Sequence, residues 1–131
     1  MMEKTLDEFF SRLDEIEFGK HDLIVAIGSG GVAPAKFIQQ KLKIPMKVVA
    51  ISYRDKSNQP KYGNAKLLEG KEFKVKNAKI LLVDDVSRTG KTLCVAKNYL
   101  KGNKIKTCLV NGEADYSFYN SQECISIPWK K

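Results

Sequence analysis

The sequence lacks several features that mark whole classes of proteins. It has no apolar run near the roughly 18 residues that a membrane-spanning helix needs. Residues 1–10 carry acidic side chains where a secretory signal would be apolar. The three cysteines, Cys94, Cys108 and Cys124, are widely spaced and include no Cys-x-x-Cys pair. We therefore expect a cytoplasmic protein with no membrane partner, in which the cysteines act as small apolar residues.

Histidine is also scarce, and acidic residues are fewer than basic ones. The only histidine, His21, stands just before an apolar run, and we expect it at the surface and not in a catalytic or metal site. The 15 acidic residues are outnumbered by 23 lysines and arginines, which gives a formal net charge of +8. A basic surface favours polyanionic partners such as nucleic acid, acidic lipid or a phosphorylated small molecule. The charge alone does not choose among them.

Short apolar runs that alternate with helical patterns make up most of the chain. Its 131 residues, 43% of them hydrophobic, predict a single domain over residues 1–131. Because the apolar strands alternate with helices, they indicate an α/β fold with a parallel sheet covered by helices on both faces. Ligands of such sheets bind beyond the carboxyl ends of the strands. We expect strands at 23–27, 48–51, 80–83 and 105–110 and helices at 5–17, 32–42 and 90–101.

Local patterns refine these boundaries. Thr5 and Glu8 have the spacing of a capping box at the start of the first helix. Gly102 is placed to stop the third helix with a left-handed cap, and the polar residues 53–66 predict a loop. The apolar face of the first helix is predicted to consist of Leu6, Phe9, Phe10, Leu13 and Ile16.

The segment after the third predicted strand, Val83 to Leu93, has the most specific chemistry. Asp84 and Asp85 lead into a turn rich in serine, threonine and glycine and then into a helix. A helix start offers free N–H groups and a positive dipole end, Gly90 allows close approach, and the nearby hydroxyls add donors, so the turn suits a phosphate. Two carboxylates beside an anion pocket make sense if the same ligand also carries hydroxyls or a divalent cation. A phosphate and a diol on one ligand describe a ribose 5-phosphate.

The residues of this segment can be compared with two other interpretations. Gly90-Lys91-Thr92 is similar to the end of a nucleotide-triphosphate P-loop, but that motif requires glycine at position 85, which is aspartate here. The acids could also only cap the following helix, although one carboxylate would suffice for that task.

Val83 to Leu93 closely resembles the signature of type I phosphoribosyltransferases, an acidic pair followed by a Thr-Gly-x-Thr turn. The resemblance implies that Asp84 and Asp85 hold the ribose 2′- and 3′-hydroxyls and that Asp85 also contacts Mg²⁺. The 5-phosphate would be bound by the next residues in the chain, namely Val86, Ser87, Arg88, Thr89, Gly90, Lys91 and Thr92.

The loop after the first predicted strand, Gly28 to Ala33, matches the G-x-G-x-x-A pattern of a dinucleotide-binding motif. No acidic residue closes the second strand to bind a ribose, and the chain leaves little room for a substrate domain. In the family resemblance this loop is the pyrophosphate-binding loop, with Ser29, Gly30 and Gly31 facing the leaving group. The family often has a basic residue where Ser29 stands, and its absence weakens the expected pyrophosphate site unless Lys36 or a partner subunit compensates.

Two further segments resemble parts of the same family. The start of the long polar loop, with Ser52, Tyr53, Arg54 and Lys56, is similar to the mobile loop that closes over the active site. Residues 114–129 resemble the base-binding hood of the xanthine–guanine branch. There a purine would stack on Tyr116 and contact backbone groups at Ile125.

The chain departs from that branch at three positions that all concern the base. Cys124 stands in place of a stacking tryptophan, Gly112 lies near the position of a lysine that meets the purine 6-oxygen, and Arg88 replaces an aspartate that faces purine N7. Trp129 is expected in the core.

The leading hypothesis is therefore a Mg²⁺-dependent phosphoribosyltransferase. It would transfer 5-phosphoribosyl from 5-phosphoribosyl-1-pyrophosphate to a base, with a purine as the expected acceptor, and the resemblance implies a homodimer. A non-catalytic regulator of the same fold, which senses the donor or a nucleotide and binds nucleic acid through its basic surface, is the alternative. A nicotinamide-dependent oxidoreductase ranks third.

Overall fold

A six-stranded sheet forms the centre of the computed structural model, which describes residues 2–28, 30–52, 66–67, 76–86, 90–121 and 125–126. The strand order is β4-β3-β2-β5-β6-β7, and the last five strands in that order run parallel while β4 pairs antiparallel with β3 at one edge. The strands of this sheet are β2 (Leu23–Gly28), β3 (Met46–Ser52), β4 (Lys66–Leu67), β5 (Lys79–Val86), β6 (Lys104–Asn111) and β7 (Tyr116–Tyr119).

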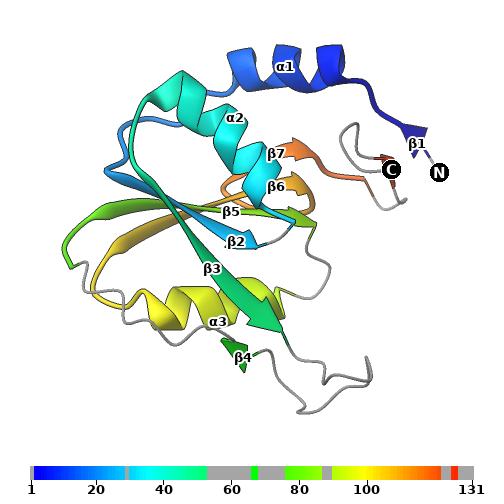
Figure 1. Ribbon diagram of the computed structural model, residues 1–131. Helices are drawn as coiled ribbons and strands as arrows, with labels where there is room; N and C mark the ends of the chain where they lie inside the picture. Colours follow the sequence, from blue (N-terminus) through cyan, green and yellow to red (C-terminus); the bar gives the residue numbers. More distant parts are fainter. Residues whose placement is uncertain are drawn as a thin grey trace.

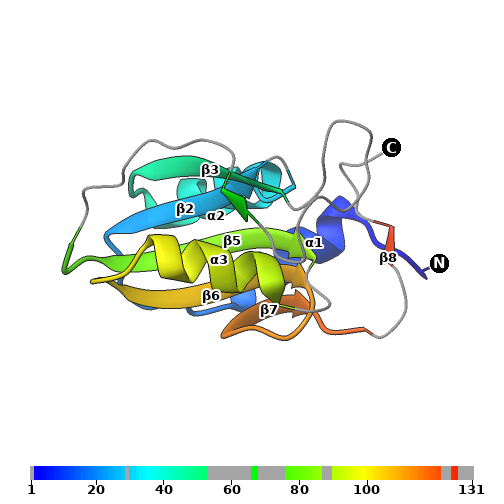
Figure 2. The same cartoon turned by 90° about the horizontal axis from the view of Figure 1, so that it is seen from below.

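Helices cover both faces of the sheet, as Figures 1 and 2 show. Helices α1 (Leu6–Glu15) and α2 (Val32–Leu42) lie on one face, and α3 (Lys91–Tyr99) lies on the other. The predicted α/β fold with a parallel sheet between helical layers is confirmed. A second, two-stranded parallel sheet of β1 (Met2–Glu3) and β8 (Ile125–Ser126) lies beyond the carboxyl ends of the central strands. The expected C-terminal hood therefore also contains the start of the chain.

Two apolar layers hold the helices to the sheet, because alternate side chains of each strand face opposite sides. On the α1 and α2 side, the rings of Phe9 and Phe118 stack with centroids 4.2 Å apart, and both are fully buried. On the α3 side, Leu82 and Leu109 pack against Leu93. The strands at the centre are apolar on both faces, which is why they appear in the sequence as unbroken apolar runs.

The first helix follows the prediction at its start but not along its face. The N–H of Glu8 donates to Thr5 Oγ1 at 3.1 Å, so Thr5 is the N-cap. Phe9 and Leu13 are buried, but Leu6 and Phe10 are 42% and 39% exposed, so the predicted apolar face is wrong at these two positions.

Two other boundaries also differ from the sequence prediction. α3 ends at Tyr99, and Gly102, with φ of +90°, lies in the following turn instead of at the cap. Strand β7 is absent from the predicted set because its four residues lie in a polar stretch that has no apolar run. Within the described ranges, no helix has both the length and the apolar character needed to cross a membrane.

Candidate functional site

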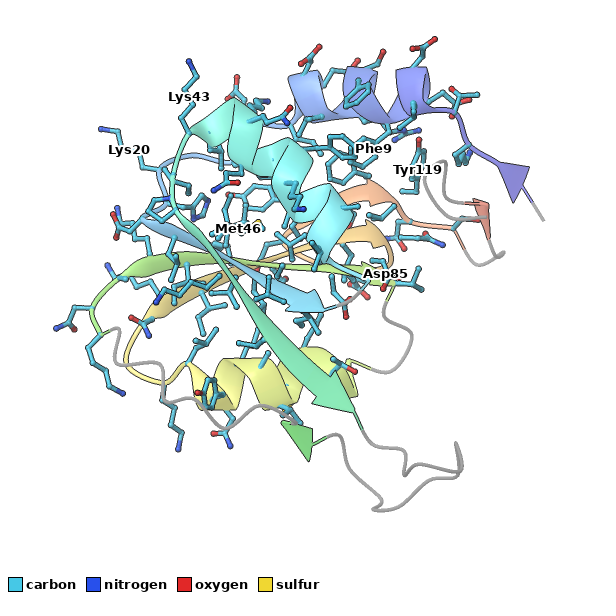
Figure 3. The ribbon with its side chains drawn as sticks, viewed as in Figure 1. Phe9, Lys20, Lys43, Met46, Asp85 and Tyr119 are labelled. Atoms are coloured by element: carbon cyan, nitrogen blue, oxygen red, sulfur yellow. The ribbon has the colours of Figure 1, made fainter. Side chains whose placement is uncertain are left out.

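The acidic pair Asp84–Asp85 lies at the carboxyl end of the central strand β5 (Figure 3). Asp84 is buried and Asp85 is half-buried. Asp84 Oδ1 accepts the N–H of Asp85 at 2.8 Å, and Asp85 Oδ1 accepts the N–H of Val86 at 2.7 Å. Short carboxylate side chains often bind nearby backbone N–H groups in this way. These bonds fix the orientation of both acids at the edge of the sheet.

The loop between β2 and α2 packs directly against the acids. A Cβ atom at Gly30 would lie 2.5 Å from Asp85 Oδ2, and one at Gly31 would collide with the carbonyl oxygen of Val83. Only glycine permits such close backbone approach. The structure therefore brings the predicted pyrophosphate loop and the acidic pair side by side. Ser29, the remaining predicted residue of this loop, lies outside the described residues.

The amino ends of two helices point to the same edge of the sheet (Figure 1). α2 begins after Gly31 and α3 after Gly90, and neither start has a side-chain cap. Gly90 has φ of +75°, a left-handed conformation that favours glycine. A helix start carries partial positive charge and free N–H groups, so each is a suitable position for an anion. The acidic pair thus lies between two positions that favour phosphate groups.

Several predicted site residues are described only in part. The backbone of Lys91 opens α3 and that of Ser52 closes β3, while Thr92 is half-buried in the first turn of α3. Ser87, Arg88 and Thr89 of the predicted phosphate turn lie outside the described residues, as do Tyr53, Arg54 and Lys56 of the predicted mobile loop.

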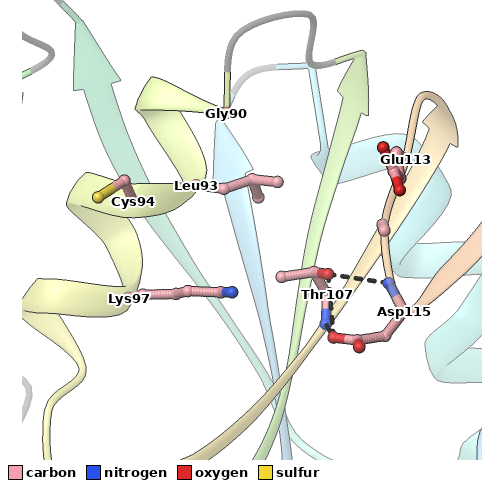
Figure 4. A pocket seen from close by; sticks show the side chains of 8 residues that line it. Gly90, Leu93, Cys94, Lys97, Thr107, Glu113 and Asp115 are labelled. Atoms are coloured by element: carbon pink, nitrogen blue, oxygen red, sulfur yellow. Dashed lines mark hydrogen bonds between the residues drawn. The ribbon is translucent and has the colours of Figure 1, made fainter.

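A pocket of about 490 Å³ lies on the flank of the domain, between α3 and the turn from β6 to β7 (Figure 4). Thr107 is paired with Leu82, two residues before Asp84, whereas Gly90 starts α3, so the pocket extends from the carboxyl edge down the flank of the sheet. No motif in the sequence indicates this pocket, because three separate segments form it. Its lining residues are Gly90, Leu93, Cys94, Lys97, Thr107, Glu113, Ala114 and Asp115.

The carboxylate of Asp115 is held in place within this pocket by Thr107. Asp115 Oδ2 accepts the N–H of Thr107 at 2.8 Å and its Oγ1 hydroxyl at 3.1 Å. Burial acts to raise the pKa of Asp115, but the two bonds from Thr107 and the nearby charges of Lys106 and Lys97 outweigh it and hold the pKa below its ordinary value.

Residues 2–119 match the family model described as phosphoribosyl transferase domain. The chain belongs to this family. The orotate phosphoribosyltransferase of Sulfurisphaera tokodaii is 31% identical to it over 108 residues, which are 81% of this chain and 49% of that protein. The chain spans about half the length of the curated relatives it matches.

Solved structures of similar shape cover almost the whole chain. The crystal structure of a purine phosphoribosyltransferase from Pyrococcus horikoshii has a TM-score of 0.79 at 25% identity and covers 99% of this chain and 93% of its own. A hypothetical protein from Neisseria gonorrhoeae with bound ppGpp has a TM-score of 0.72 at 20% identity, with 99% and 90% covered. The second likeness shows the fold alone.

Within this phosphoribosyl transferase domain, the predicted base-binding residues are not brought together. The Tyr116 hydroxyl donates to the carbonyl of Phe18 at 2.9 Å, and its ring packs against Phe18 in the segment before β2. Its side chain is therefore directed away from the carboxyl edge, and a base stacked on Tyr116 does not fit this placement. Ile125, whose backbone pairs with Met2, lies in the two-stranded sheet beyond that edge. Cys124 lies outside the described residues.

His21 also differs from its expected surface position. It is half-buried, and its Nε2 lies 2.5 Å from the carbonyl oxygen of Phe18 while its ring meets that of Tyr116 edge-on. The residue therefore packs in the same aromatic group as Tyr116, at the end of the sheet opposite the acids.

Two residues at the carboxyl edge were missed by sequence reasoning. Asn111 ends β6 and is buried, although asparagine is usually exposed. Tyr119 ends β7 and is also buried, with Arg12 and Lys4 over its ring at 4.4 and 4.9 Å. Burial raises the pKa of Tyr119, Glu8 adds to this effect, and Arg12 opposes it. A polar residue at the end of an apolar run, as in Leu109-Val110-Asn111, was the available signal.

Proposed function

We propose that this domain transfers the 5-phosphoribosyl group from 5-phosphoribosyl-1-pyrophosphate to a nitrogenous base and so forms a nucleoside 5′-monophosphate and pyrophosphate. The observation that carries this proposal is the position of Asp84 and Asp85 between two anion-binding features, the Gly30–Gly31 loop and the start of α3. The donor has the matching order of groups, with a phosphate at C5, a diol at C2 and C3, and a pyrophosphate at C1.

Each part of the site has a role in this proposal. Asp84 and Asp85 accept hydrogen bonds from the ribose hydroxyls. The turn from Val86 to Thr92 binds the 5-phosphate through its amides and hydroxyls. The loop of Ser29, Gly30 and Gly31 presents amides to the pyrophosphate, as does the adjoining start of α2.

Mg²⁺ fits this arrangement as an ion that arrives with the donor. Among the residues that the structure describes, no group of three or more histidine, cysteine or acidic side chains surrounds a metal position. Mg²⁺ usually takes one or two carboxylates and fills its remaining positions with phosphate oxygens and water. Asp85, half-buried beside the glycine loop, is the residue that we propose to hold it. When bound, the ion would neutralise charge on the departing pyrophosphate.

Bond cleavage at C1 requires no protein nucleophile in this mechanism. The sugar passes through an oxocarbenium-like state, and the protein stabilises the leaving pyrophosphate by fixed amides and by positioning. The loop with Ser52, Tyr53, Arg54 and Lys56 is proposed to close over the donor, bringing cations to the pyrophosphate and excluding water.

A purine is the first acceptor to test. The structure of the purine phosphoribosyltransferase is matched over nearly its full length, whereas the orotate phosphoribosyltransferases are matched over about half of theirs. We also propose that the domain acts in the cytoplasm and as a homodimer, as expected from the sequence and the family.

The decisive assay measures pyrophosphate release with donor, Mg²⁺ and a panel of guanine, hypoxanthine, xanthine, adenine and orotate. Release with one base, lost when Asp84 and Asp85 are both replaced by asparagine, is the expected result, because the carboxamides cannot accept the same charge-assisted hydrogen bonds. We expect the double variant to bind the donor at least about 100-fold more weakly, since hydrogen bonds to charged groups contribute about 1.5–3 kcal/mol each. Replacement of Asp14 and Glu15, both exposed at the end of α1, by their amides is the matched control. Absence of release with every base would defeat the proposal.

A binding protein without turnover remains the second candidate, because the net charge of +8 suits a polyanion and a neighbour of this fold carries bound ppGpp. It would bind the donor without releasing pyrophosphate, and it would bind nucleic acid with an affinity that falls steeply with salt.

A further inference from the structure

One buried amide joins the central sheet to the chain segment that forms the hood. Asn111, the last residue of β6, is 6% exposed. Its Oδ1 accepts the N–H of Ser121 at 2.8 Å, and its Nδ2 donates to the carbonyl of Ser121 in a longer bond of 3.4 Å. A single side chain thus holds both backbone groups of a residue ten positions later.

The position of this clamp connects the two halves of the site. Asn111 is paired with Val86 of β5, the first residue of the proposed phosphate turn, and with Tyr119 of β7 on its other side. Ser121 follows β7 by two residues and precedes β8 by four. The clamp therefore ties the approach to the β1–β8 sheet to the strand beside the acids (Figure 1).

The turn between β6 and β7 supports the same arrangement. The N–H of Gly112 donates to the carbonyl of Tyr119 at 3.1 Å, and Ser117 Oγ donates to the carbonyl of Gly112 at 2.6 Å. Gly112, with φ of +139°, offers no side chain to a base. After β7, the described backbone is held by Asn111 at Ser121.

We infer that Asn111 is a positioning residue for the acceptor base, an inference that rests on the proposed function. It acts through Ser121 and the hood and not by contact with the sugar phosphate. Its loss would release the start of the hood segment, while the acids, the glycine loop and the start of α3 would keep their positions. The variant should therefore bind the sugar phosphate normally and lose the added affinity that the base supplies.

Calorimetry with ribose 5-phosphate and with GMP, IMP, AMP and orotidine 5′-monophosphate measures how much affinity the base adds. For each protein, the Kd of ribose 5-phosphate is divided by that of the nucleotide that the wild type binds most tightly, and the ratio reports the contribution of the base. For Asn111→Ala we expect this ratio to fall about tenfold, which two lost hydrogen bonds account for. We expect the Kd of ribose 5-phosphate to change less than that of the nucleotide, because both bonds of the amide go to Ser121 and neither goes to Val86.

Further variants separate anchoring from simple loosening of the fold. Asn111→Leu keeps the branched shape of the side chain without its polar atoms. The contribution of the base should fall as in Asn111→Ala, so this variant serves if the alanine variant does not fold. Asn111→Asp keeps the acceptor for the Ser121 N–H but turns its second oxygen towards the Ser121 carbonyl, so the contribution of the base should also fall in this variant.

Asn103 provides a matched control. Its amide accepts the N–H of Ala78 at 3.0 Å and donates to the carbonyl of Leu100 at 2.9 Å, at the opposite end of the sheet. Asn103→Ala removes a clamp of the same kind and should leave the ratio unchanged.

The outcomes distinguish this inference from the proposed function. A wild-type protein that binds neither ribose 5-phosphate nor any nucleotide overturns the proposed function and the inference with it. If the wild type binds both and the alanine and leucine variants keep its ratio, the role of Asn111 alone is wrong. Equal loss of the ratio in Asn103→Ala would also overturn it, because the effect would then be general.

Discussion

Replacement of Gly30 by alanine tests the close contact on which the proposed donor site depends. The new Cβ would lie 2.5 Å from Asp85 Oδ2 and 2.6 Å from Asp85 Cγ. Non-bonded carbon and oxygen atoms rest about 3.5 Å apart, so the loop and the carboxylate must separate by about 1 Å. A misplacement of about 1 Å can cost about 100-fold in rate. We therefore expect Gly30→Ala to lower kcat/KM by about 100-fold.

The same substitution should destabilise the fold, because Asp85 cannot turn aside without losing its bond to the Val86 N–H. Overpacking of this kind costs about 1–3 kcal/mol of unfolding free energy. Urea unfolding of Gly30→Ala, Asp85→Ala and the double variant measures the coupling between the two positions. In the Asp85→Ala background the crowding atoms are absent, so the added cost of Gly30→Ala should nearly vanish.

Gly19→Ala is the control for the general cost of replacing a glycine. Gly19 has φ of +72°, and no atom of the described residues lies within 4 Å of the position that a Cβ would occupy there, so alanine strains the backbone without crowding any of them. It should destabilise the fold and leave kcat/KM unchanged. The reasoning is refuted if Gly30→Ala retains full kcat/KM, or if its effect on stability is the same with and without the Asp85 carboxylate.

Two further predictions concern the rest of the fold. Because the pKa of Asp115 is lowered in the folded state, its contribution to stability is present above the unfolded value of about 3.9 and is lost as the pH falls through the folded value. Thr107→Val removes one of the lowering hydrogen bonds, so NMR titration should show a higher pKa for Asp115, and the variant should lose less stability than the wild type below about pH 4. Phe9→Ala should cost about 3–5 kcal/mol of unfolding free energy because the buried ring stacks on Phe118. Phe10→Ala should cost less, because that ring is 39% exposed and meets Phe9 and Phe37 edge-on, and urea unfolding measures both variants.

The sugar-phosphate half of the site could be predicted from the sequence because each part of it is local. Asp84 and Asp85 lie at the end of a buried strand, and the helix that we propose to bind the phosphate begins within the next few residues. Gly30 and Gly31 likewise follow a buried strand directly. Parallel strands place their carboxyl ends at one edge, so the two loops meet without any further information. The contact between Gly30 and Asp85 follows from that topology, and only its closeness required the structure.

The proposed base half could not be predicted in the same way because the segments expected to form it are distant in the sequence. Strand β7 has four residues and only one apolar face, so it lacks the unbroken apolar run that identified the central strands. Tyr116 carries a polar group and an aromatic ring, which suit base stacking and core packing equally well in a sequence. The hydroxyl bond to Phe18, 98 positions earlier, decides between them, and no spacing rule indicates such a partner.

The sugar-phosphate residues are contiguous in the sequence and the proposed base-side residues are not, and this contrast also concerns which base such a domain accepts. The acidic pair and the following turn lie in one contiguous segment, so they depend only on one strand, one turn and one helix start. The base side instead requires the end of β6, the chain after β7 and the N-terminal strand β1 to keep their mutual positions. Asn111 joins the end of β6 to the chain after β7 through Ser121. β1 pairs with β8 at Ile125. If this connection sets the acceptor, a change in base preference would come from substitutions that move the hood as well as from those that contact the base. Ser121→Pro, which removes the N–H that Asn111 Oδ1 accepts, should then shift the relative affinities for GMP and orotidine 5′-monophosphate while the affinity for ribose 5-phosphate stays constant.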